Sequence, residues 1–142
     1  MPDGTAGYIQ LFHLAALWAR VGGVPHQMVF RKLCEWAACD AFPTGALVDR
    51  FERPIQSRVI YFDLETAMWG QWEAQNRLTE ILVRVSDLPA FCERTNTILP
   101  QPLLSGRLRR WLAARGGKHR VPPACPETAE KFRLHYLPGD TG

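Results

Sequence analysis

Apolar residues recur every three or four positions over two stretches near the start of the chain, which predicts two amphipathic helices within residues 8–43. The apolar stripe of the first helix consists of Leu11, Leu14, Ala15, Trp18 and Val21. Gly22 and Gly23 predict its end, because glycine readily adopts the left-handed conformation of a helix terminus. Pro25 favours a second helix start, where its missing N–H costs no hydrogen bond.

The second helix has a similar division between apolar and polar positions. Its apolar stripe consists of Val29, Leu33, Trp36 and Ala37. Its polar residues are expected to lie largely on the other faces, in contact with water: His26, Gln27, Arg31, Lys32 and Glu35. The turn residues after Ala41 close this segment.

Between residues 53 and 95 the pattern changes several times and predicts both strand and helix. Residues 58–63 are rich in β-branched and aromatic side chains, which predicts a short strand. Apolar spacing predicts a helix over residues 65–78, although Gly70 carries a helix cost of about 1 kcal/mol. Alternation over residues 79–85 favours a strand, with continuation of the helix as the alternative. A short helix over residues 88–94 follows, with Ser86 or Asp87 as its N-cap.

The end of the chain predicts one more helix and then an irregular tail. Ser105 resembles an N-cap, and the Gly116-Gly117 pair predicts the helix end, giving a helix over residues 103–117. Four prolines punctuate residues 121–142. We therefore expect an α+β fold, mainly α, with residues 1–120 as a single globular domain and residues 121–142 as a tail. The 46 % content of apolar residues is sufficient for a real core.

Several short motifs in residues 8–43 occur in a recognisable order. They are Tyr8-Ile9, Ala15-Ala16, Gly22-Gly23-Val24, the helix through Arg31 and Lys32, and Ala41-Phe42-Pro43. This order resembles the small winged helix-turn-helix modules of MerR-type and excisionase-type proteins. The later passage over residues 83–91 resembles the strand and helix that follow the wing in those families. The chain departs from the pattern in having Asp40-Ala41 where a glycine normally precedes the hydrophobic-Pro pair, and about 35 residues separate the two parts.

The resemblance implies that the second helix enters the major groove of DNA. The residues that would then face the groove are His26, Gln27, Arg31 and Lys32. Arginine and glutamine side chains suit the edges of bases because they can form paired hydrogen bonds. The alternative is that these positions are simply the wet face of an amphipathic helix, whose net charge is near zero because Glu35 and Asp40 accompany the cations.

Positive charge is concentrated in one later part of the sequence. No carboxylate occurs between Glu93 and Glu127, and residues 103–120 contain Arg107, Arg109, Arg110, Arg115, Lys118 and Arg120. The chain as a whole carries only +3, so the rest of it is net negative. The cations are expected to contact phosphates, which makes affinity fall steeply with salt. The alternative is that they pair with acids of the same molecule.

The chemistry of the remaining residues excludes the common catalytic classes. The serines lack a Gly-x-Ser-x-Gly context, Gly116-Gly117-Lys118 does not follow a strand as a phosphate loop does, and no cofactor motif is present. The four cysteines form no CxxC pair, so buried thiols are favoured over a zinc site built from Cys34 and Cys39 with His26 or His119. We expect neither catalysis nor a bound metal or cofactor.

These observations predict a small non-enzymatic DNA-binding regulator or accessory protein. The chain has no run of about 20 apolar residues and no signal-peptide start, which favours a soluble protein of the cytoplasm. The alternative is a protein-interaction module that docks on an acidic partner, since five tryptophans are many for one small core. The sequence determines neither the target nor the oligomeric state.

Overall fold

The computed structural model describes residues 7–68, 70, 72–100 and 118–126. It has an α+β fold in which helices predominate. Its elements, in chain order, are β1 (Tyr8–Gln10), α1 (Leu11–Gly22), α2 (His26–Ala38), β2 (Leu47–Val48), α3 (Ser57–Met68), α4 (Trp72–Thr79), β3 (Leu82–Arg84), the 3₁₀ turn η1 (Val85–Asp87) and α5 (Leu88–Thr95).

The three strands form one antiparallel sheet in the order β1-β3-β2. Val83 lies opposite Ile9 on one side and opposite Leu47 on the other. It is fully buried, whereas Leu82 and Arg84 on either side of it are half-buried. This alternation is the period of two that a strand requires, and the strand predicted within residues 79–85 is confirmed.

Helices α1 and α2 form as the sequence predicts. Leu11, Leu14, Ala15 and Trp18 are buried, and so is the whole predicted stripe of α2. Gly23 ends α1 with φ of 64°, and the Val24 N–H donates to the Ala19 carbonyl at 3.1 Å. Val21 differs from the prediction, because this residue of the final turn is 43 % exposed.

The strand predicted over residues 58–63 is wrong, because these residues form the first half of α3. Ile60 and Leu64 lie four positions apart and are both buried, with the half-buried Ala67 three positions further on. This spacing places one apolar face against α2, and such burial outweighs the strand propensity of β-branched residues. The helix predicted over residues 65–78 is also divided in two, because Gly70 has φ of 85° between α3 and α4.

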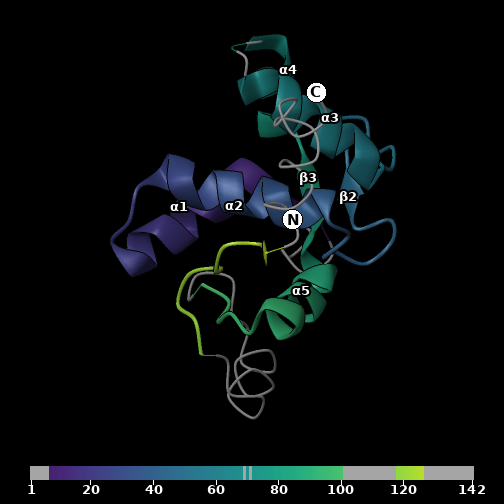
Figure 1. Ribbon diagram of the computed structural model, residues 1–142. Helices are drawn as coiled ribbons and strands as arrows, with labels where there is room; N and C mark the ends of the chain where they lie inside the picture. The colour runs from purple at the N-terminus through teal and green to yellow at the C-terminus, as the bar shows by residue number, and fades with distance from the viewer. Residues whose placement is uncertain (1–6, 69, 71, 101–117, 127–142) are drawn as a thin grey trace.

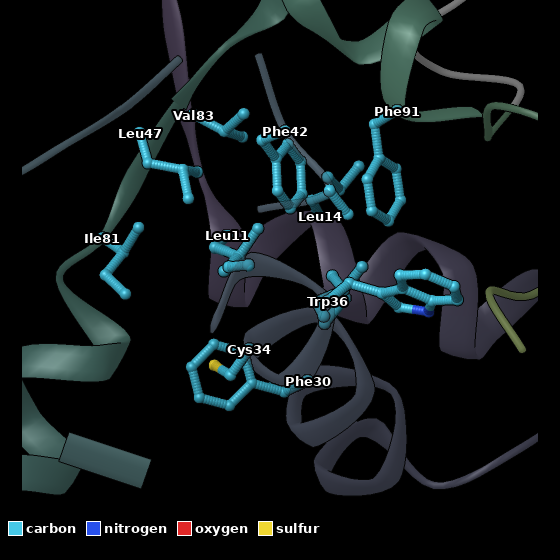
Figure 2. Packing of buried hydrophobic residues seen from close by; sticks show 14 of the residues in the cluster. Leu11, Leu14, Phe30, Cys34, Trp36, Phe42, Leu47, Ile81, Val83 and Phe91 are labelled. Carbon is cyan, nitrogen blue, oxygen red and sulfur yellow. The ribbon is translucent and has the colours of Figure 1, made fainter. Parts of the chain in front are cut away.

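The core lies where α1 and α2 meet the sheet and α5. The rings of Phe42 and Phe91 stack with centroids 4.2 Å apart and an angle of 7° between their planes. Figure 2 shows these two rings at one side of the cluster, with Phe30 and Cys34 at the other. In Figure 1, α3 and α4 lie at one end of β3 and α5 lies at the other. The α3–α4 pair therefore lies at the end of β3 opposite to α5, which carries Phe91.

The segment after residue 117 packs on the helices. The Trp36 indole N–H donates to the Pro123 carbonyl at 2.8 Å, and Cys125 is 3 % exposed. Figure 2 shows the Trp36 ring nitrogen directed at this segment. Residues 121–126 thus belong to the packed unit, although the sequence assigns them to a tail. A buried indole N–H requires an acceptor, and a partner 87 positions away cannot be recognised from local sequence.

No helix among the described residues is long and apolar enough to cross a membrane.

Candidate nucleic-acid interface

Helix α2 is buried over more than half of its circumference. Seven of its thirteen residues are buried. Phe30 and Cys34 line a cleft shared with α3, and Phe30 also contacts Phe12 of α1, while Trp36 faces the C-terminal segment. The outward arc is formed by Met28, Arg31, Lys32 and Glu35, and the exposed Gln27 lies at the first turn. An approaching DNA duplex would therefore meet one narrow face of mixed charge.

His26 does not belong to that face. Its Nε2 lies 2.7 Å from the Phe12 carbonyl oxygen, so the nitrogen carries the proton and donates to α1. Its ring also lies against the Phe12 ring, with centroids 4.1 Å apart. His26 joins the start of α2 to α1 and is half-buried. Its predicted role at the groove is therefore replaced by a role in holding the two helices together.

Arg31 and Lys32 lie on the outward arc of α2, and the Arg31 guanidinium forms an ion pair with an acid of the same helix. Its Nε lies 3.0 Å from Glu35 Oε2, one helical turn later. Burial raises the pKa of Glu35, and the hydrogen bond from Arg31 opposes that rise. A phosphate that binds Arg31 must therefore compete with a carboxylate of the same helix.

The described cations of the basic segment differ from Arg31. Lys118 and Arg120 are exposed, and in the described part of the chain neither one pairs with a carboxylate. The backbone of Lys118 and of the neighbouring His119 is fixed, because their N–H groups donate to the Asn96 carbonyl at 3.1 and 2.9 Å. The other predicted cations, Arg107, Arg109, Arg110 and Arg115, lie outside the described residues.

The loop between β2 and α3 presents an aromatic side chain that sequence reasoning missed. One carboxylate oxygen of Asp49 accepts the N–H groups of Phe51 and Arg53, and this lowers the Asp49 pKa, with the Arg53 N–H as the main cause. Phe51 is 62 % exposed, and the guanidinium carbons of Arg50 and Arg53 lie 4.8 and 5.0 Å from its ring centre. The available signal was the aspartate, which commonly bonds the backbone two residues later in a turn.

A second feature missed from the sequence joins α3 to α4. Asp63 is 5 % exposed, and its carboxylate accepts hydrogen bonds from Arg77 Nε and Nη2, the shortest at 2.8 Å. The bond to Asp63 raises the pKa of Arg77. Asp63 is the last residue of the strand predicted over residues 58–63, yet it lies in the middle of α3. Its partner is 14 residues away on another element, so its role is structural.

Burial keeps two of the four thiols in the protonated form. Cys34, Cys39, Cys92 and Cys125 are all buried and free of disulfides. Burial raises the pKa of Cys92 to about 12 and raises that of Cys34 further, so both remain protonated thiols at neutral pH. Among the residues that the structure describes, no group of histidines, cysteines and acids is arranged to hold a metal ion.

Comparisons with protein families, curated proteins and solved structures find no match to this chain. The functional proposal therefore stands on the residues and their geometry.

Proposed function

We propose that this protein is a small non-enzymatic DNA-binding regulator or accessory protein of the winged helix-turn-helix type. The order of its elements supports the proposal. An apolar opening strand leads into α1, a glycine turn joins α1 to α2, and a Phe-Pro exit leads to β2. Strand β3 is followed directly by η1 and the short helix α5.

The observation that carries the proposal is the pairing of β2 with β3 across a long insertion. Leu47 and Val48 of β2 lie opposite Val83 and Leu82 of β3, although residues 49–81 separate the strands. The separation of about 35 residues is thus a helical pair inserted between two neighbouring strands. When α3 and α4 are set aside, the remaining order of a strand, two helices, two paired strands and a short helix is the order expected of a winged module, which supports the proposal.

On this proposal the DNA contacts divide between two regions. Gln27, Arg31 and Lys32 of α2 face the groove, where glutamine and arginine suit base edges. Lys118, Arg120 and the predicted cations between residues 103 and 117 contact phosphates. The second group supplies the sequence-independent affinity and the first supplies selectivity.

Fluorescence anisotropy with a labelled mixed-sequence duplex of about 30 base pairs tests the proposal across a salt series. We expect log Kd to rise linearly with log salt, by close to one unit of slope for each phosphate contacted. Replacing Lys118→Gln and Arg120→Gln together should lower the slope by about two. The control is Arg58→Gln, which removes an exposed cation on α3. No binding at 50 mM salt, or a flat slope, contradicts the proposal.

A second variant tests α2 itself. Glu35→Gln removes the negative charge that holds Arg31 and keeps the shape of the side chain. We expect this variant to bind DNA several-fold more tightly, because Arg31 no longer has to leave a carboxylate. Unchanged or weaker binding would show that α2 does not face the duplex.

A second candidate function is protein interaction, and the exposed apolar residues of the α3–α4 pair favour it. Val59 and Phe62 are 45 % and 58 % exposed on α3, and Trp72 is 64 % exposed at the start of α4. Aromatic residues are enriched at the centres of protein interfaces. Pull-down after nuclease treatment separates the two functions, because a protein partner survives the treatment and a nucleic-acid tether does not.

A further inference from the structure

The cleft between α2 and the α3–α4 pair has the size and the lining of a small-molecule site. Its volume is about 460 Å³, within the range of roughly 300–1,000 Å³ that is usual for such sites. Phe30, Cys34, Leu64 and Leu78 form its apolar floor, and little of each side chain is exposed there because all four are buried. Figure 2 shows Phe30 and Cys34 beside each other at this side of the core.

Aromatic and amide groups complete the lining. The half-buried Phe12 meets Phe30 edge-on, with ring centres 4.9 Å apart and planes at 85°. Gln27 of α2 and Gln75 of α4 are exposed and also line the cleft. The Gln75 side-chain N–H group donates to the Ala67 carbonyl at 3.4 Å, a long bond that a ligand can replace.

The charge of the lining favours an uncharged occupant. Arg31 is the charged side chain among the described residues that line the cleft, and it is paired with Glu35 at 3.0 Å. The Cys34 thiol is protonated, because burial raises its pKa. An anion would approach the Glu35 carboxylate, and a cation would approach the Arg31 guanidinium, so a charged ligand gains little from either.

We propose that this cleft binds an uncharged molecule of two or three fused aromatic rings, whose body lies against Phe12 and Phe30 and whose polar group lies between Gln27 and Gln75. Amide side chains both donate and accept, so a hydroxyl or carbonyl group fits this position. Gln27 and Arg31 also belong to the face of α2 assigned to DNA. Occupancy of the cleft therefore weakens DNA binding, and this second part rests on the proposed function.

Ligand-observed saturation-transfer NMR with 2-naphthol tests the site without DNA. We expect saturable binding to the full chain, and a Kd at least tenfold higher for naphthalene-2-carboxylate and for 2-naphthylmethylammonium. Ala67→Phe places a ring in the cleft and should weaken 2-naphthol at least tenfold. The matched control is Ala90→Phe, which adds the same ring at an exposed position of α5. Absence of saturation, or equal affinity of the wild type and Ala67→Phe, overturns the proposal.

A second variant covers the case in which Ala67→Phe does not fold. Gln27→Leu with Gln75→Leu changes two exposed residues and leaves the apolar surface intact. It should reduce the preference for 2-naphthol over naphthalene several-fold, because the ring contacts remain and the amide contacts do not. An unchanged preference contradicts the assigned position of the polar group.

The effect of the cleft ligand on DNA binding is measured separately, as the Kd for the labelled duplex. Saturating 2-naphthol should raise the Kd for the labelled duplex several-fold, and Ala67→Phe should abolish this effect. If 2-naphthol saturates the cleft and no DNA binds, the proposed function fails while the cleft stands. If DNA binds and 2-naphthol does not, the cleft fails alone. If both bind with no mutual effect, the coupling is overturned.

Discussion

The two helical pairs of this molecule, α1–α2 and α3–α4, differ in how deeply they bury their aromatic side chains. Each pair buries an apolar face, and each contains tryptophan. In the first pair Trp18 is fully buried and its indole N–H donates to the Ile98 carbonyl at 2.8 Å. In the second pair Trp72 is 64 % exposed. The first pair is the centre of the core, whereas the second covers one side of α2 and presents aromatic side chains to solvent.

The difference teaches how an insertion can be added to a small fold. Residues 49–81 leave and rejoin the sheet at paired strands, so β2 and β3 are neighbours although this segment separates them. The two ends of the segment are tied to the framework of α1, α2 and the sheet, because the Ile55 N–H donates to the Leu47 carbonyl and the Ile81 carbonyl accepts the Leu11 N–H. The inserted pair is held by the apolar contact of α3 with α2 and internally by the Asp63–Arg77 pair. We therefore expect damage to α1–α2 to unfold the protein and damage to α3–α4 to remain smaller or local.

The largest difference should appear between the two tryptophans. Trp18→Ala removes a fully buried ring and a hydrogen bond, and should lower the free energy of unfolding by about 3–5 kcal/mol. Trp72→Ala should change it by less than about 0.5 kcal/mol, as is usual for surface positions. Guanidinium denaturation followed by circular dichroism measures both values. A similar loss for the two variants would show that Trp72 is buried in solution and would remove the contrast.

The next effect concerns the ion pair of α3–α4. Asp63→Asn keeps the volume of a buried side chain but removes the charge that Arg77 meets, and should cost about 1–2 kcal/mol, because Arg77 itself is half exposed to water. Glu80→Gln, which alters the exposed contact to Arg50 at 3.8 Å, is the control and should cost less than about 0.5 kcal/mol. Thermal unfolding of both variants gives the comparison. A stable Asp63→Asn variant would mean that apolar contacts alone hold α4.

A third test compares the glycines that follow the first helix of each pair, which are α1 and α3. Gly23 and Gly70 have φ of 64° and 85°, and a Cβ at either position meets nothing within 4 Å. Gly23→Ala and Gly70→Ala should therefore cost about 1 kcal/mol each, from backbone conformation rather than from clashes. Gly7→Ala, where φ is not in the left-handed region, should be nearly neutral. Costs above 3 kcal/mol for Gly23→Ala would point to a contact that the structure does not contain.

The smallest expected effect concerns how often each helical pair opens to solvent. Cys34 lies under the α3–α4 pair and Cys92 lies in α5, and burial holds both as protonated thiols at neutral pH. If the inserted pair opens more readily than the framework, mass spectrometry after timed alkylation should find Cys34 modified several-fold faster than Cys92. Equal rates would indicate that both thiols become accessible only by global unfolding.

Local patterns predicted the two helices and the central strand of the framework but not β1 or β2, and they predicted the insertion poorly. The stripes of α1 and α2, the glycine turn and β3 all depend on residues close together in the sequence. The first half of α3 was predicted as a strand, because Val59, Ile60, Tyr61 and Phe62 favour strands, while the contact with α2 that makes them helical is distant in sequence. The Asp63–Arg77 and His26–Phe12 contacts join separate helices. Spacing alone could not place either partner.

The candidate site shows the same division. Gln27 and Arg31 are exposed and Lys32 is half-buried on the side of α2 that periodicity predicts to be polar, opposite the apolar stripe. The pairing of Arg31 with Glu35 was within reach, because residues four apart on a helix are neighbours. The position of Lys118 beside Asn96 could not be predicted, because it depends on hydrogen bonds across 22 residues.

The hydrogen bonds at Asn96 give one residue two roles. Asn96 ends α5 in the left-handed conformation, with φ of 57°. Its carbonyl also accepts the N–H groups of Lys118 and His119, and the His119 carbonyl accepts the Ile98 N–H. The end of α5 therefore fixes where Lys118 lies, so a change in the last turn of α5 also displaces this cation.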